Sequence, residues 1–114
     1  MMKEFDYVNP YSNEEMKAVF VRDSYVEGDG LYLGMQVKRL EEDYYEPWCS
    51  VTVNIVPASG YCSENCAYLD DNNCPDLEEY FAENGLAEKT GRYAVSGFRM
   101  YPEYDFSKLI EMIK

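Results

Sequence analysis

Apolar and polar residues alternate along residues 31–38 more regularly than anywhere else in the chain. The apolar positions are Leu31, Leu33, Met35 and Val37. Because successive side chains of a β-strand point to opposite faces, this segment is expected to form a strand with one buried face. Residues 16–22 and 49–55 have similar patterns, and the Gly-rich residues 27–30 mark a turn between the first two strands. Three strands with short links predict an antiparallel meander.

Two helices are expected in the second half of the chain. The first begins near Pro75, with Asn73 or Cys74 as its N-cap. Gly85 ends it by taking the left-handed conformation, which glycine adopts without steric cost. The second helix begins at Ser107, a favourable capping residue.

The fold class follows from the order of these elements. A fourth strand is expected over residues 92–101, interrupted at Gly97, and a short edge strand over residues 67–69. The sequence therefore predicts one α+β domain over residues 1–114, an antiparallel sheet of about four strands in the order β-β-β-α-β-α, with the helices on one face. The expected core consists of Leu31, Leu33, Met35, Val37, Val51, Val53, Ile55, Leu77 and Phe81.

The net charge of −12 is confined to one stretch of the chain. Between Leu40 and Glu88 there are twelve acids and neither Lys nor Arg, whereas the remaining ten acids are balanced by all ten bases. Such a field repels nucleic acid and anionic membranes and attracts basic surfaces. Direct binding of DNA or RNA is therefore not expected, because it needs clustered Lys and Arg. The alternative is a solvated acidic face that aids solubility.

The composition also limits chemistry and location. Histidine is absent, which excludes His-based triads, a His general base and His metal ligands. No nucleophile motif stands out and carboxylates are too numerous for one pair to be singled out, so we expect no catalytic residues and no enzyme activity. The apolar runs are too short to span a membrane and the first residues lack the apolar stretch of a signal peptide, so a soluble, cytoplasmic protein is expected.

Cysteines and an acidic turn raise the question of metal sites. Cys49, Cys62, Cys66 and Cys74 lack the C-x2-C spacing of usual zinc ligand pairs. We therefore expect free thiols, buried or in loops, with a zinc site as the alternative. Disulfides are not expected in a chain without an export signal. Residues 70–73 resemble the start of a calcium loop, but Pro75 and Phe81 occupy the positions that need Gly and Glu. We expect no metal and no cofactor.

Tyrosine is used unusually often, with twelve copies. Tyr44 and Tyr45 lie inside the acidic segment 41–47, and Tyr32 falls on the outward face of its strand. Exposed Tyr beside carboxylates suits protein binding, because the ring offers area and a hydroxyl at low entropic cost. The alternative is that these rings cover the second face of the sheet.

An ordered set of short motifs resembles a known family. The motifs are Val51-Thr52-Val53-Asn54, Cys66-Ala67-Tyr68-Leu69-Asp70, Asn72-Asn73-Cys74-Pro75, Glu83-Asn84-Gly85-Leu86, Thr90-Gly91-Arg92, Ser96-Gly97-Phe98 and Tyr101-Pro102-Glu103-Tyr104. Together they resemble a small acidic family of unknown function carried on mobile elements of Firmicutes, over roughly residues 51–106. The resemblance implies a bacterial host cell and, by analogy, a protein that blunts host defence, of the anti-CRISPR or anti-restriction type. It carries over no catalytic residues.

Two functions are compatible with these features. The first is a DNA mimic that blocks the basic channel of a host defence nuclease without chemistry, with Tyr44, Tyr45 and Tyr68 lying against the target's Arg or Lys side chains. The second is an accessory interaction module that binds a partner through an aromatic face. The expected partner-binding residues are Glu41, Glu42, Asp43, Tyr44, Tyr45, Glu46, Asp70, Asp71, Glu78, Glu79 and Glu83.

Overall fold

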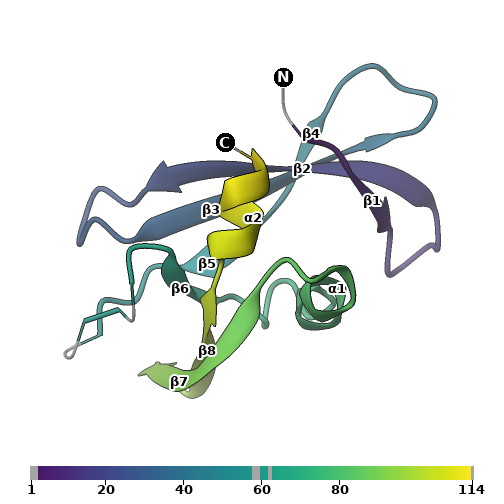
Figure 1. The fold of residues 1–114 in the computed structure, drawn as a ribbon. Helices are drawn as coiled ribbons and strands as arrows, with labels where there is room; N and C mark the ends of the chain where they lie inside the picture. Colours follow the sequence, from purple (N-terminus) through teal and green to yellow (C-terminus); the bar gives the residue numbers. More distant parts are fainter. Residues whose placement is uncertain (1–2, 58–59, 62, 114) are drawn as a thin grey trace.

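The computed structural model describes residues 3–57, 60–61 and 63–113, and these form two antiparallel sheets with two short helices (Figure 1). The first sheet has the order β1-β2-β3-β4 and the second has the order β5-β6-β8-β7. The strands of the first sheet are β1 (Phe5–Val8), β2 (Glu15–Ser24), β3 (Leu31–Arg39) and β4 (Glu46–Ser50). Those of the second are β5 (Thr52–Val53), β6 (Cys66–Leu69), β7 (Glu88–Ser96) and β8 (Arg99–Asp105). The helices are α1 (Leu77–Asn84) and α2 (Ser107–Ile113).

This architecture is mainly β, and it corrects the prediction of one sheet with about four strands. The expected strands over residues 16–22 and 31–38 are present as β2 and β3. The expected fourth strand is instead a hairpin, because Gly97 takes a φ of 64° and turns the chain between β7 and β8. Since there are two sheets, the expectation that both helices cover one face of a single sheet does not apply.

The segment predicted as the third strand is divided between the two sheets at Val51. The Val51 N–H donates to Leu33 of the first sheet at 2.8 Å, and its carbonyl accepts from Asp70 beside the second sheet at 2.8 Å. This crossing shifts the alternation by one residue, so that Thr52 is buried while Val53 is only half-buried. Val53 and also Ile55, which is half-buried, therefore lie outside the fully buried core where they were predicted.

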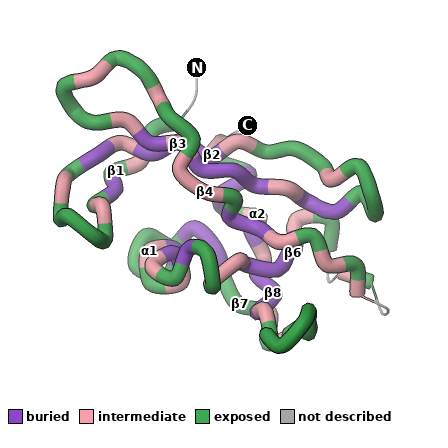
Figure 2. Tube along the Cα trace, turned by 180° about the vertical axis from the view of Figure 1, so that it is seen from behind, coloured by how far each residue is buried: buried purple, intermediate pink, exposed green. Residues whose placement is uncertain are grey.

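The rest of the predicted core is buried between the two sheets (Figure 2). Phe81 of α1 is fully buried and contacts Phe20 of β2 and Phe106 before α2, with ring centroids 5.9 and 5.7 Å apart. Strand β6 was predicted at an edge but lies between β5 and β8, which explains why all four of its residues are buried.

Helix α1 ends as predicted and begins differently. Gly85 has a φ of 63°, and the next N–H, from Leu86, donates to the Phe81 carbonyl at 3.0 Å. The N-cap is Asp76 rather than Asn73 or Cys74, and its side chain makes no capping hydrogen bond. That carboxylate instead accepts a hydrogen bond from β1, which brings α1 against the first sheet. Among the described residues no helix is long and apolar enough to cross a membrane.

Candidate functional site: an acidic end of the molecule

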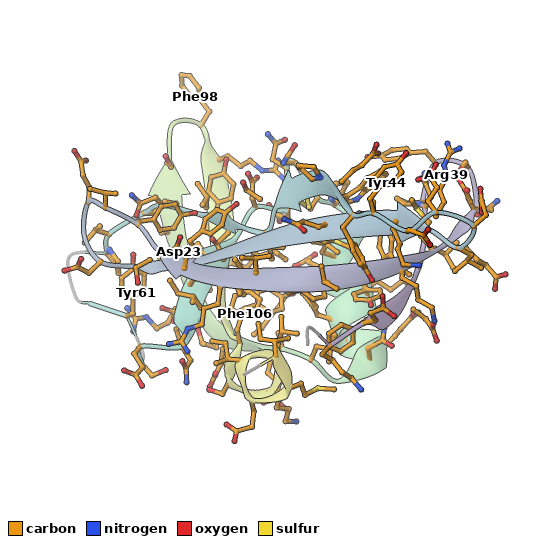
Figure 3. All side chains as sticks on the ribbon, turned by 90° about the horizontal axis from the view of Figure 1, so that it is seen from above. Asp23, Arg39, Tyr44, Tyr61, Phe98 and Phe106 are labelled. Atoms are coloured by element: carbon orange, nitrogen blue, oxygen red, sulfur yellow. The ribbon has the colours of Figure 1, made fainter. Side chains whose placement is uncertain are left out.

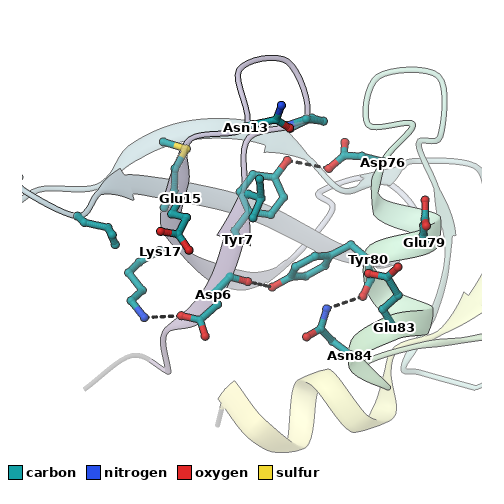
Figure 4. A pocket seen from close by; sticks show the side chains of 14 residues that line it. Asp6, Tyr7, Asn13, Glu15, Lys17, Asp76, Glu79, Tyr80, Glu83 and Asn84 are labelled. Atoms are coloured by element: carbon teal, nitrogen blue, oxygen red, sulfur yellow. Dashed lines mark hydrogen bonds and ion pairs between the residues drawn. The ribbon is translucent and has the colours of Figure 1, made fainter.

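A groove of about 860 Å³ lies between β1, the start of β2 and α1 (Figure 4). We call it the acidic groove, because five carboxylates line it and a single base does. The carboxylates are Asp6, Glu15, Asp76, Glu79 and Glu83, and the base is Lys17. Lys17 forms an ion pair with Asp6, so four carboxylates of the groove remain without a base among its lining residues.

Two tyrosines hold the walls of the acidic groove together. The Tyr7 and Tyr80 rings meet edge to face, with centroids 5.5 Å apart. The Tyr7 hydroxyl donates to Asp76 Oδ2 at 2.7 Å and accepts from Trp48 Nε1 at 3.2 Å. The Tyr80 hydroxyl donates to the Asp6 carbonyl at 2.8 Å. These bonds join β1 to α1, which lie 69 and 74 residues apart in the sequence at these contacts.

Both hydroxyls stay protonated at neutral pH and act as fixed donors. Burial, reinforced by the Asp76 carboxylate, raises the pKa of Tyr7 well above its usual range. Burial, with a smaller contribution from Asp6, raises the pKa of Tyr80 to about 12. The hydrogen bond from Lys17 lowers the pKa of Asp6. The arrangement therefore presents negative charge above an aromatic floor, which suits a cationic side chain.

The loop between β3 and β4 carries the second group of carboxylates. We call residues 41–46 the acidic loop; Glu41, Asp43 and Glu46 are exposed there and Glu42 is half-buried. Its backbone is tied down because Lys38 Nζ donates to the Glu42 carbonyl at 3.3 Å. The residue before the loop, Leu40, lines the acidic groove. The acidic loop, β1 and α1 lie at the same end of the molecule, which we call the acidic end (Figure 1).

Six of the predicted binding carboxylates lie at the acidic end (Figure 1). They are Glu41, Glu42, Asp43 and Glu46 of the loop and Glu79 and Glu83 of α1. Within the described part of the chain, none of the six forms an ion pair with a base. Of the bases at this end, Lys17 pairs with Asp6, Arg39 pairs with Glu14 at 3.5 Å, and Lys38 Nζ donates to the backbone carbonyl of Glu42 rather than to a carboxylate.

The other predicted carboxylates have partners within the chain. The acidic stretch between Leu40 and Glu88 therefore carries less unpaired negative charge than its sequence indicates. Asp71 pairs with Arg99 at 3.1 Å, and Asp70 accepts the backbone N–H of Asn73 at 3.1 Å. Glu78 pairs with Lys89 at 3.1 Å and also accepts from the Tyr104 hydroxyl at 3.1 Å. Glu88 likewise pairs with Lys108 at 3.0 Å. We refer to the four carboxylates Asp70, Asp71, Glu78 and Glu88, with their partners, as the paired face.

The predicted aromatic anchors are placed differently from one another. Tyr44 is 54% exposed, whereas Tyr45 is half-buried and its hydroxyl donates to the Glu4 carboxylate. Tyr68 is 1% exposed inside β6, so the prediction that it lies against a target is wrong. Tyr32 is also half-buried, edge to face with Tyr25 at 5.5 Å.

Three residues of the acidic groove were missed by reasoning from the sequence. Asp6 and Glu15 lie in the part of the chain that is neutral overall, and Asp76 was counted among the acids but not selected. Only the pairing of β1 with β2 and the packing of α1 bring them together. No periodicity within one segment could have signalled this.

The cysteines do not form a described metal centre. Among the residues that the structure describes, no three His, Cys, Asp or Glu side chains are grouped to hold a metal ion. Cys49 and Cys74 are free thiols, whereas Cys66 is disulfide-bonded, which contradicts the expectation of free thiols at that position. Cys62 lies outside the described residues.

Comparison with protein families gives a match over residues 20–112 to a family described as a domain of unknown function (DUF4313). The chain belongs to this family. The match begins well before residue 51, where the resemblance noted in the sequence began, so it also includes the second half of β2, all of β3 and the acidic loop. No curated protein and no solved structure matches the chain.

Proposed function

We propose that this DUF4313 protein is a non-enzymatic inhibitor that binds the basic nucleic-acid channel of a host defence nuclease with its acidic end. The observation that carries the proposal is the group of six carboxylates at that end that lack a described basic partner. The channel of a DNA-binding enzyme is lined by Lys and Arg, which the same carboxylates attract. The resemblance to a family of mobile elements supplies the setting, a bacterial cytoplasm, and the anti-CRISPR or anti-restriction class.

The carboxylates act in place of phosphates. Duplex DNA carries one charge per ~1.7 Å of helix axis, so several closely spaced carboxylates are needed to imitate a short length of it. The acidic loop supplies four within six residues, and Glu79 and Glu83 share one face of α1 because they are four residues apart. Tyr44 stands among the loop carboxylates, where its exposed ring is available to stack on an Arg side chain.

Charge of this kind acts mainly on the rate of association. Surface charges steer encounters over a distance that salt limits to roughly 8 Å at physiological ionic strength. Binding by the acidic end is therefore expected to weaken steeply as salt rises. Replacing Tyr44 with Ala should instead speed dissociation, because a stacked ring is lost only after the complex forms.

The test compares two variants that each lose four carboxylates, one in the acidic loop and one at exposed sites outside it. The loop variant carries Glu41→Gln, Glu42→Gln, Asp43→Asn and Glu46→Gln. The matched control carries Asp23→Asn, Glu27→Gln, Asp29→Asn and Glu64→Gln, which are all exposed. Strand β3 separates the β2–β3 turn from the acidic loop by about 30 Å.

The readout is DNA cleavage by a panel of restriction and CRISPR nucleases, at two salt concentrations. We expect wild type and control to inhibit a member of the panel equally, and the loop variant to associate about tenfold more slowly. Equal loss in both four-site variants would show that total charge, not the acidic end, is responsible. Inhibition that is indifferent to salt and to all eight substitutions would exclude mimicry.

A second candidate function rests on the tip of the β7–β8 hairpin. Phe98 projects from this tip into solvent (Figure 3), and Tyr93, Val95 and Met100 are 51%, 68% and 58% exposed. Apolar side chains gathered in this way are typical of protein-binding surfaces. An accessory interaction module would use this hairpin rather than Tyr45 or Tyr68. Loss of binding in Phe98→Ser, with no dependence on salt, would favour this function over mimicry.

A further inference from the structure

Two free thiols from distant segments meet beside the acidic end. Cys49 of β4 is paired with Met35 of β3, so its side chain shares the inward face of the sheet with that buried residue. Cys74 lies in the turn before α1 and is 3% exposed. Its thiol donates to the carbonyl of Ser50, the residue after Cys49, at 3.3 Å. Both cysteines line one small cavity, which places the two thiols side by side.

A small cavity gives access to this pair. It has a volume of about 200 Å³ and is lined by both thiols together with Tyr11, Trp48, Asn73 and Asp76. Tyr11, at its edge, is 78% exposed. Cys49 is half-buried and Cys74 is buried, so a small reagent that enters the cavity reaches Cys49 first.

We propose that Cys49 and Cys74 form a dithiol modification site, which a low-molecular-weight disulfide converts into an intramolecular disulfide. In the first step the Cys49 thiol gives its proton to solvent and the thiolate attacks the reagent, whose S–S bond breaks; one reagent thiolate leaves and takes up a proton, and a mixed disulfide remains on Cys49. In the second step the Cys74 sulfur attacks Cys49, and the second reagent thiol leaves with the proton from Cys74. The protein dithiol is oxidised by two electrons and the reagent is reduced to two thiols.

The surroundings of the two thiols favour this order. The adjacent Cys49 thiol, together with burial, raises the pKa of Cys74 well above its usual range, so that Cys74 remains a thiol. The more accessible Cys49 is therefore the attacking group, and Cys74 is the resolving group. The product would join β4 to the turn that carries Asp76, and hence would fix one wall of the acidic groove.

The experiment treats the full chain with oxidised glutathione and maps its cysteines by mass spectrometry under non-reducing conditions. We expect wild type to lose two hydrogens and to yield a peptide linked through Cys49 and Cys74. A bond between them closes a loop in the unfolded chain, so the melting temperature should rise by about 5 °C. Recovery of both thiols unmodified in the folded protein, or a glutathione that persists on Cys49, would overturn the proposal.

Two variants separate the roles of the thiols. Cys74→Ser should stop at the first step, with one glutathione retained on Cys49, whereas Cys49→Ser should leave Cys74 unmodified. Circular dichroism establishes that each variant is folded. The peptide map of the wild type tests formation of the disulfide even if a variant fails to fold. Glutathione retained on Cys74 in the Cys49→Ser variant would contradict the assigned order.

Discussion

Neighbouring residues of α1 have opposite surroundings. Glu78 belongs to the paired face, where Lys89 and the Tyr104 hydroxyl each approach its carboxylate at 3.1 Å. Glu79 lines the acidic groove, where the one base is already paired with Asp6. The two residues have the same chemistry and adjacent positions, so the difference arises wholly from which segments the fold brings against each side of the helix.

This contrast shows that a count of acids along the sequence overstates the charge that is available for binding. The paired face draws its bases from β7, the hairpin tip and α2, all beyond the acidic stretch. At the acidic end the fold adds Asp6 and Glu15 from the neutral part of the chain, while among the described bases Lys17 and Arg39 pair with Asp6 and Glu14, and Lys38 bonds to a backbone carbonyl. Charge at one region is thus offset locally, whereas at the other it accumulates.

The largest expected effect comes from removing the side chain that fixes α1 between the two regions. Phe81 is fully buried and contacts Phe20 and Phe106. Phe81→Ala should lower the free energy of unfolding by about 3–5 kcal/mol, because it leaves a cavity among large rings. Urea denaturation measures this, with Glu83→Ala, an exposed site on the same helix, as the control. A loss below about 1 kcal/mol would mean that other contacts hold α1 in place.

The next effect concerns Glu103 of β8, a carboxylate that is fully buried. Glu103 is 0% exposed, accepts a hydrogen bond from the Thr90 hydroxyl at 2.7 Å and pairs with Arg92 at 3.5 Å. Thr90→Val should cost about 1–3 kcal/mol of stability, because the valine keeps the shape but not the donor. Thr90→Ser retains the hydroxyl and should lose less in the same thermal unfolding measurement. Equal losses would assign the effect to packing.

High pH should weaken the contact between β1 and α1. The pKa of Tyr80 is raised from its ordinary value of 10 to about 12 in the folded protein. Its contribution to stability is therefore complete below pH 10, where folded and unfolded chains are both protonated, and is lost as pH rises from 10 to 12. Urea midpoints across this range should fall less steeply for Tyr80→Phe than for wild type. An identical pH dependence of the urea midpoint in the two proteins would show that the Tyr80 hydroxyl has the same pKa in the folded and unfolded chains.

The smallest effects address the contrast between Glu78 and Glu79 directly. A double-mutant cycle between Glu78→Gln and Lys89→Gln should give a coupling energy of about 0.2–1 kcal/mol, as is usual for partly exposed pairs. The same cycle between Glu79→Gln and Lys89→Gln should give none, and Glu79→Gln alone should change stability by less than about 0.5 kcal/mol. Equal coupling in the two cycles would remove the distinction between the acidic end and the paired face.

Local patterns predicted those parts of the fold that depend on neighbouring residues. The alternation over residues 31–38 became β3, and Gly85 ended α1, because both depend on local backbone geometry. The error at Val51 has the same origin. Residues 49–55 alternate as one strand would, but a chain that leaves one sheet for another exchanges its partners, and alternation carries no information about partners.

The sequence by itself determined the net charge, its confinement to residues 40–88, the absence of histidine and the presence of two good β-strands. Only the tertiary structure decided which carboxylates are offset and which accumulate, because ion pairs and grooves join segments that are far apart in the chain. The pair between Asp71 and Arg99 spans 28 residues, and the contact between Tyr80 and Asp6 spans 74. The same physical reason places Cys49 beside Cys74, since each thiol is positioned by a different element and neither has a local pattern that points to the other.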